Sequence, residues 1–104
     1  MAAQITSGQL EVTDVATSLA DLIDIGTDSS IEYVVLTKES GSAGEVVIGD
    51  ENVELSTPPT DPPINGTRLP ANTQVIRSIT QLDGLYLLGE SAVPPTLVQC
   101  EVYH

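Results

Sequence analysis

The side chains that could do chemistry in this chain are one histidine, one cysteine and a large set of carboxylates. His104 is the last residue, and a general base needs a side chain that the fold packs and positions, which a chain end rarely provides. With a single histidine in that place, no serine or cysteine triad is indicated. The sequence therefore predicts no catalytic residues and a protein that is not an enzyme.

Clustered carboxylates are the remaining candidates for acid-base work or metal binding. Asp50 and Glu51 could act as an acid and a base, but adjacent acids in a Gly-Asp-Glu-Asn stretch are more typical of a solvated turn. Oxygen ligands for calcium occur in two sets: Asp21, Asp24 and Asp28, and Asp50, Glu51 and Asn52. Neither set has EF-hand spacing, and zinc or iron would find no ligand set. We expect acidic turns, with no metal and no cofactor.

Three further motifs have a structural explanation. Cys100 alternates with Val98 and Val102, which predicts a buried thiol on one face of a strand, and a lone cysteine excludes an internal disulfide. The motif Pro59-Thr-Asp-Pro62 fits the P-x-x-P pattern, but among acids it indicates a rigid surface loop. Asn65-Gly-Thr67 fits the glycosylation pattern, and without a secretory signal it predicts a turn.

The composition predicts one small domain with an aliphatic core. The chain has 104 residues, of which 40% are hydrophobic, yet it contains neither Phe nor Trp. A core of this size and composition leaves little spare stability. We therefore expect partner subunits or a docking surface to contribute to the stability of the functional form.

The charge balance is strongly acidic. Fifteen Asp and Glu residues face only Lys38, Arg68 and Arg77, for a formal net charge of −12. Such a surface repels phosphate backbones and anionic lipids, which argues against nucleic-acid or membrane partners. We find no signal-like leader and no apolar run long enough for a membrane span, and we expect synthesis in a cytoplasm.

Short strands with turn signals dominate the pattern. We expect strands at residues 31–38, 45–48, 52–55, 73–79, 84–88 and 96–103, with brief pairing at 67–69. The 31–38 strand is apolar on both faces, as in a central strand, and the glycines after it predict a hairpin returning as 45–48. The last three strands also have hairpin spacing. The proline-rich stretch 56–66 predicts a loop, with positive φ angles expected near Gly66 and at Asn72.

The first thirty residues are ambiguous. Residues 9–13 alternate as in a strand, whereas 14–25 also have helical spacing, and we favour a strand followed by an extended arm over a short helix. The sequence thus predicts a single domain with an N-terminal strand and arm at 1–30 and a body at 31–104. The expected fold class is all-β: a small jelly-roll-like sandwich or barrel of antiparallel strands, with an immunoglobulin-like sandwich as the alternative.

Three segments in order carry a family resemblance: 45–53, Arg68-Leu-Pro-Ala-Asn72 and Leu82-Asp-Gly-Leu-Tyr-Leu-Leu-Gly89. A strand entering a Gly-Asp turn, a variable loop, a leucine-proline turn and a strand containing Leu-Tyr resemble small β-rich virion proteins of tailed bacteriophages. The similarity is to the capsid decoration, or cement, proteins and covers about residues 31–103.

This resemblance implies a structural role on the outer surface of a capsid. The expected partner is the major capsid protein, whose subunits a homotrimer would bridge, so that several modest contacts act together. The N-terminal 1–30 segment is expected to supply much of the contact. The alternative is a tail- or fibre-associated β-module that binds a host surface or another tail protein. An adhesin-like or matrix subunit is a third hypothesis, which the missing secretion signal disfavours.

Overall fold

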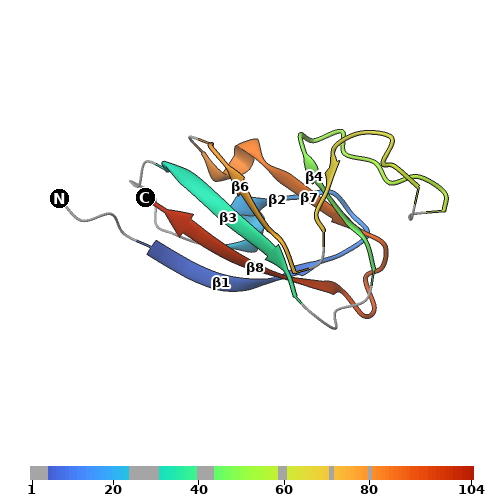
Figure 1. The fold of residues 1–104 in the computed structure, drawn as a ribbon, viewed down its shortest axis with the longest axis horizontal. Coiled ribbons are helices and arrows are strands. Elements are labelled where there is room, and N and C mark those ends of the chain that lie inside the picture. The colour runs from blue at the N-terminus through green and yellow to red at the C-terminus, as the bar shows by residue number, and fades with distance from the viewer. Residues whose placement is uncertain (1–4, 24–30, 40–43, 59–60, 71, 80) are drawn as a thin grey trace.

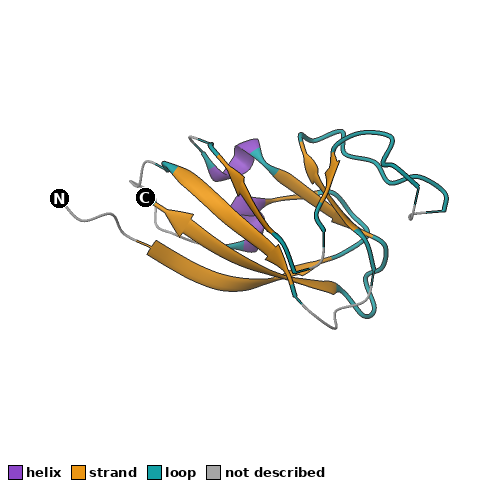
Figure 2. Cartoon of the chain, viewed as in Figure 1, coloured by secondary structure: helices purple, strands orange, loops and turns teal. Residues whose placement is uncertain are grey.

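Two antiparallel sheets, packed face to face, form the protein (Figures 1 and 2). The computed structural model describes residues 5–23, 31–39, 44–58, 61–70, 72–79 and 81–104. Each sheet has four strands within these ranges. The prediction of an all-β fold, and of a small sandwich in particular, is confirmed. The jelly-roll arrangement within that class stays a prediction.

The first sheet contains the longest strands. Its order is β1 (Ile5–Val12), β8 (Thr96–Tyr103), β3 (Tyr33–Lys38) and β6 (Gln74–Arg77). β1 and β8 pair over eight consecutive residues, and β3 pairs with β8 over six. Figure 1 shows these long strands side by side along the body of the molecule. The first sheet is therefore a continuous surface built from both ends and the middle of the chain.

The second sheet is made of shorter strands. Its order is β2 (Thr17–Ser18), β7 (Tyr86–Gly89), β4 (Val46–Gly49) and β5 (Thr67–Arg68). Two short helical turns accompany it, α1 (Leu19–Leu22) and the 3-10 turn η1 (Leu82–Gly84). The backbone amide of Leu19 donates to the carbonyl of Leu85 at 2.9 Å, which fixes the start of α1 beside the strand that follows η1.

Aliphatic side chains fill the space between the sheets. Alternate residues of each strand point inward, as the pleat requires. The buried cluster consists of Leu10, Val12, Leu19, Ile31, Val34, Leu36, Val46, Ile48, Leu69, Leu85, Leu87, Val98, Cys100 and Val102. Val47 lies on the opposite face of β4 and is also fully buried, close to Gly66 and Val53 of the following loop. β4 is therefore covered on both faces.

Several local predictions are confirmed. The 31–38 segment is an interior strand of its sheet, with Val34 and Leu36 buried on one face and Val35 on the other. Residues 96–103 are β8 in full, and the brief 67–69 strand is β5. Positive φ angles occur at Gly66, at 110°, and at Asn72, at 61°.

The predicted pairing of neighbouring strands is wrong. β3 and β4 belong to different sheets, so 31–38 and 45–48 do not form a hairpin. The last three strands also alternate between the sheets: β6 and β8 lie in the first and β7 in the second. Residues 52–55 contribute only an isolated bridge from Glu54 to Asn65. A sandwich whose chain crosses between layers buries the same apolar residues without consecutive pairing.

The N-terminal region combines the two alternatives left open by the sequence. The strand at 9–13 is confirmed as part of β1, which is longer and is integrated into the first sheet. In place of an extended arm, the described part of 14–25 contains β2 and the single turn of α1. Residues 1–4 and 24–30 lie outside the described residues.

Candidate functional site

His104 is fixed in place although it ends the chain. Its Nε2 lies 2.8 Å from Oγ1 of Thr6, so the end of β8 is tied to the start of β1. The buried Nδ1 has no hydrogen-bond partner among the described residues. A hydroxyl hydrogen-bonded to an imidazole is the arrangement of a nucleophile and its general base. In a triad a third group also hydrogen-bonds the other ring nitrogen, and no described residue does so here. The contact is one that joins two strands.

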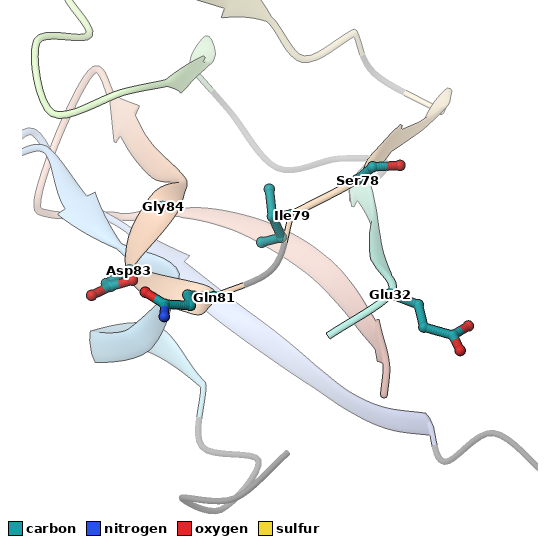
Figure 3. Close-up of a pocket in the computed structure, with 6 residues that line it drawn as sticks. All are labelled: Glu32, Ser78, Ile79, Gln81, Asp83 and Gly84. Atoms are coloured by element: carbon teal, nitrogen blue, oxygen red, sulfur yellow. The ribbon is translucent and has the colours of Figure 1, made fainter. Parts of the chain in front are cut away.

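A shallow pocket lies between the loop that follows β6 and the start of β3. Its volume is about 400 Å³, and it is lined by Glu32, Ser78, Ile79, Gln81, Asp83 and Gly84. Figure 3 shows Glu32 and Asp83 on opposite sides of the pocket, with carboxylates that do not point toward one another. General acid-base catalysis by a carboxylate pair needs both groups to face one bound atom. These two do not converge in that way.

The acidic clusters act as local turn formers where the structure describes them. Oδ1 of Asp50 accepts the backbone amide of Asn52 at 2.8 Å, and its carbonyl accepts the amide of Val53 at 3.2 Å. Oδ2 of Asp21 accepts a hydrogen bond from the hydroxyl of Ser18, with the two oxygens 3.4 Å apart, at the start of α1. Asp24 and Asp28 lie outside the described residues. Among the described ones, no group of three acids, histidines or cysteines is placed to hold a metal ion.

The remaining motifs are structural as well. Burial raises the pKa of the Cys100 thiol to about 12, and the Glu101 carboxylate adds to the shift, so the thiol stays protonated and unreactive at neutral pH. Asn65 takes part in the bridge to Glu54, and Gly66 makes the turn after it. In the P-x-x-P motif, residues 59 and 60 lie outside the described part.

None of the three cations is fully exposed. Lys38 is 9% exposed, and its position in β3 is on the inner side of the first sheet, beside Val98. Arg68 is held by Oε2 of Glu45, 3.3 Å from its Nε, and by the carbonyl of Asp61, 2.5 Å from its Nη2. Arg77 is half-buried. The exposed surface is therefore even more anionic than the net charge indicates.

The outer face of the first sheet carries apolar and aromatic side chains. The rings of Tyr33 and Tyr103 stack with centroids 4.4 Å apart and an interplanar angle of 15°. Ile5 lies opposite Tyr103 in the register and is 53% exposed, and Ile76 lies opposite Val35 and is 59% exposed. We call these five residues the outer patch. Tyr33, which the sequence places in a core-like strand, projects from the outer face instead.

A polar row borders the outer patch. Oε2 of Glu39 accepts hydrogen bonds from Nε2 of Gln9, at 2.5 Å, and from Nε2 of Gln99, at 3.1 Å. These bonds link the residue that follows β3 to the middle of β1 and the middle of β8. Glu101, opposite Val35, is the one carboxylate whose register position lies between the patch residues. The outer patch is thus an apolar surface with hydrogen-bonding groups at its border, as in protein-protein interfaces.

Comparisons with known proteins give no match: no protein-family model fits the chain, and neither curated proteins nor solved structures are significantly similar to it. Among the residues that the structure describes, no helix combines the length and apolar character needed to cross a membrane. The outer patch is therefore the feature from which a function is best argued.

Proposed function

We propose that this chain is a non-enzymatic structural protein that binds the outer surface of a tailed-bacteriophage capsid and stabilises it by bridging major capsid protein subunits. The observation that carries the proposal is the outer patch, which leaves Ile5 and Ile76 more than half exposed beside a tyrosine pair. The order of the three segments at 45–53, 68–72 and 82–89, which resembles decoration proteins, supports the choice of partner.

The patch has the composition of a docking surface. Tyrosine supplies a large contact area at low entropic cost and keeps a polar hydroxyl for the wet border. Val35 is already buried among its neighbours, so a partner covering Ile5 and Ile76 would extend an existing apolar cluster. Removing apolar surface from water contributes about 25 cal/mol of favourable transfer free energy for each Å² covered.

The charge distribution favours a basic surface on the capsid. Because the cations are buried, paired or half-buried, the exposed ionisable groups of the described residues are mainly carboxylates, and the half-buried Glu101 lies between the patch residues. A partner that presents Arg or Lys would gain attraction during approach, and Arg could also lie against the tyrosine rings. We expect binding to weaken as salt is raised, in contrast to a purely apolar contact.

The N-terminal segment contributes to this surface through Ile5, at the start of β1. Deleting residues 1–30 would test the contact poorly, because β1 forms eight register pairs with β8 and its loss would disrupt the first sheet. Single substitutions in the patch are a sharper test, since the backbone pairing is kept.

The experiment is a co-sedimentation assay with capsids that lack a decoration protein, using the wild-type chain, I76E and V93E. Both substitutions place a carboxylate at an exposed position, since Val93 is 89% exposed on the loop between β7 and β8. We expect I76E to weaken capsid binding by about tenfold or more and V93E to leave it nearly unchanged. Equal binding by I76E would show that the patch is not the contact surface.

The tail- or fibre-associated module is the second candidate, and one observation favours it. Tyr33 and Tyr103 are on the surface rather than in the core, and aromatic side chains are common in receptor-binding sites. Their stacking covers one face of each ring, which reduces the flat area left for a ligand. Mass spectrometry of purified virions separates the two: a copy number comparable with that of the major capsid protein supports decoration, and one comparable with tail proteins supports the alternative.

A further inference from the structure

The outward edge of β1 is lined by a regular series of backbone hydrogen-bonding groups. The amide of Glu39 donates to the carbonyl of Leu97 at 3.0 Å, and this pair continues the register of β3 with β8. Because antiparallel neighbours alternate, even-numbered residues of β8 then face β1, and even-numbered residues of β1 face β8. The backbone groups of Ile5, Ser7, Gln9 and Glu11 therefore point away from the sheet.

Within the part of the chain that the structure describes, this edge lacks the usual protection against strand pairing. Its eight register pairs with β8 run without a bulge, and the strand contains neither Pro nor Lys. The other three edge strands of the described sheets are much shorter, with two residues in β2, two in β5 and four in β6. A long, regular edge is a template for an added strand, which native proteins generally block or cover.

The charge along the edge identifies the strand that would cover it. Residues 5–10 contain no ionisable side chain, and Glu11 is the only one in β1. A basic partner would be attracted to the carboxylates elsewhere on the surface. A second copy of this chain also has a net charge of −12, and it would meet the least repulsion along this neutral stretch. We propose that β1 pairs with β1 of a second copy across a two-fold axis, joining the first sheets into one.

The sequence of β1 suits such a symmetric pair. With the axis at Gly8, Ser7 lies opposite the partner's Gln9 and Ile5 lies opposite the partner's Glu11, so no carboxylate faces another. The outward-facing backbone amides and carbonyls of the two copies then form hydrogen bonds with each other, since odd-numbered residues of one β1 lie opposite odd-numbered residues of the other. A two-fold interface of this kind is closed and self-complementary. This dimer goes beyond capsid binding and replaces the homotrimer that the family resemblance implies.

The test is the concentration dependence of the molar mass, measured by sedimentation equilibrium in high salt so that charge repulsion is screened. The monomer mass is 10.9 kDa, and we expect an equilibrium between this mass and twice this mass. S7P removes an outward donor from β1 and is expected to raise the dimer dissociation constant by about tenfold or more. Q74P is the matched control, because the same alternation places Gln74 outward on β6, the opposite edge.

A second pair of variants separates pairing from folding. S7E keeps the backbone donor but adds a carboxylate at the interface, and Q74E adds one at the far edge. We expect S7E to weaken the dimer strongly at low salt and less at high salt, and Q74E to have little effect. Monomers at every concentration, a trimer, or equal effects of the Ser7 and Gln74 substitutions would overturn the proposal. Capsid binding is measured separately, so failure of this dimer leaves the proposed function standing.

Discussion

Thr6 and His104 are 98 positions apart in the chain, and their side chains meet through a hydrogen bond of 2.8 Å. The contact joins the first and last strands of the fold at the end of their eight-residue ladder. In a domain with little spare stability, such a contact limits fraying of both chain ends. It also supports β1, the strand that carries Ile5 of the outer patch.

We expect T6V to lower the free energy of unfolding by about 1 kcal/mol, since it removes one partly buried hydrogen bond. Urea unfolding of T6V, H104A and the double variant forms a cycle that isolates the pair. A coupling energy near zero would mean that the hydrogen bond contributes no stability. S7A is a suitable control, because Ser7 is its exposed neighbour in the same strand.

The turn at Gly66 should be intolerant of any side chain. Its φ is 110°, and an added Cβ would lie 2.6 Å from Cγ2 of Val47 and 2.8 Å from the carbonyl oxygen of Ile48. We expect G66A to destabilise the fold by about 2–4 kcal/mol, through backbone strain and the contact with buried Val47. G84A is the control, since a Cβ there meets nothing within 4 Å. Equal thermal shifts for the two variants would contradict this explanation.

The position of most strands could be predicted from the sequence, whereas their partners could not. Period-two alternation in 96–103 gives both the extent of β8 and its inward face. In 31–38 and 45–48 the apolar runs fit either sheet, and the glycines between them fit a crossing between sheets as well as a hairpin. The apolar composition of a segment predicts that it forms a buried strand. Which strand it pairs with depends on packing between segments that are distant in the sequence.

The same limit applies to the outer patch and to His104. Because 31–38 is apolar on both faces, the pattern does not specify that Tyr33 points outward. For His104 a signal existed: its even number extends the series Val98, Cys100 and Val102, which places it on the inward face near the other end strand. Only the register of β1 with β8 then brings Thr6 within reach.

Salt should stabilise this protein against unfolding. A net charge of −12, with Arg68 paired and Lys38 buried, leaves like charges on the surface that repel each other in the compact state. Raising ionic strength from about 0.01 M to 1 M shortens the screening length from about 30 Å to 3 Å. We expect the melting temperature of a dilute sample to rise over this range. A fall would mean that the Arg68 ion pair outweighs the repulsion.

Alkaline pH should destabilise the fold through Cys100. Burial raises the pKa of its thiol from the usual 9.0 to about 12, with a further contribution from Glu101, so between these values the folded chain keeps a proton that the unfolded chain has released. Stability is then fully present below pH 9 and is lost as the pH rises toward 12. The expected loss is about 1.4 kcal/mol for each pH unit in this window.

C100V tests this origin, because valine also fits a buried strand position and does not ionise. Its free energy of unfolding, measured by urea titration from pH 8 to pH 11, should fall less steeply than that of the wild type. Burial, with smaller contributions from Glu101 and Tyr33, also raises the pKa of Tyr103, so part of the decline above pH 10 should remain in the variant. Identical slopes for the two proteins would assign the alkaline transition to the tyrosine instead of the thiol.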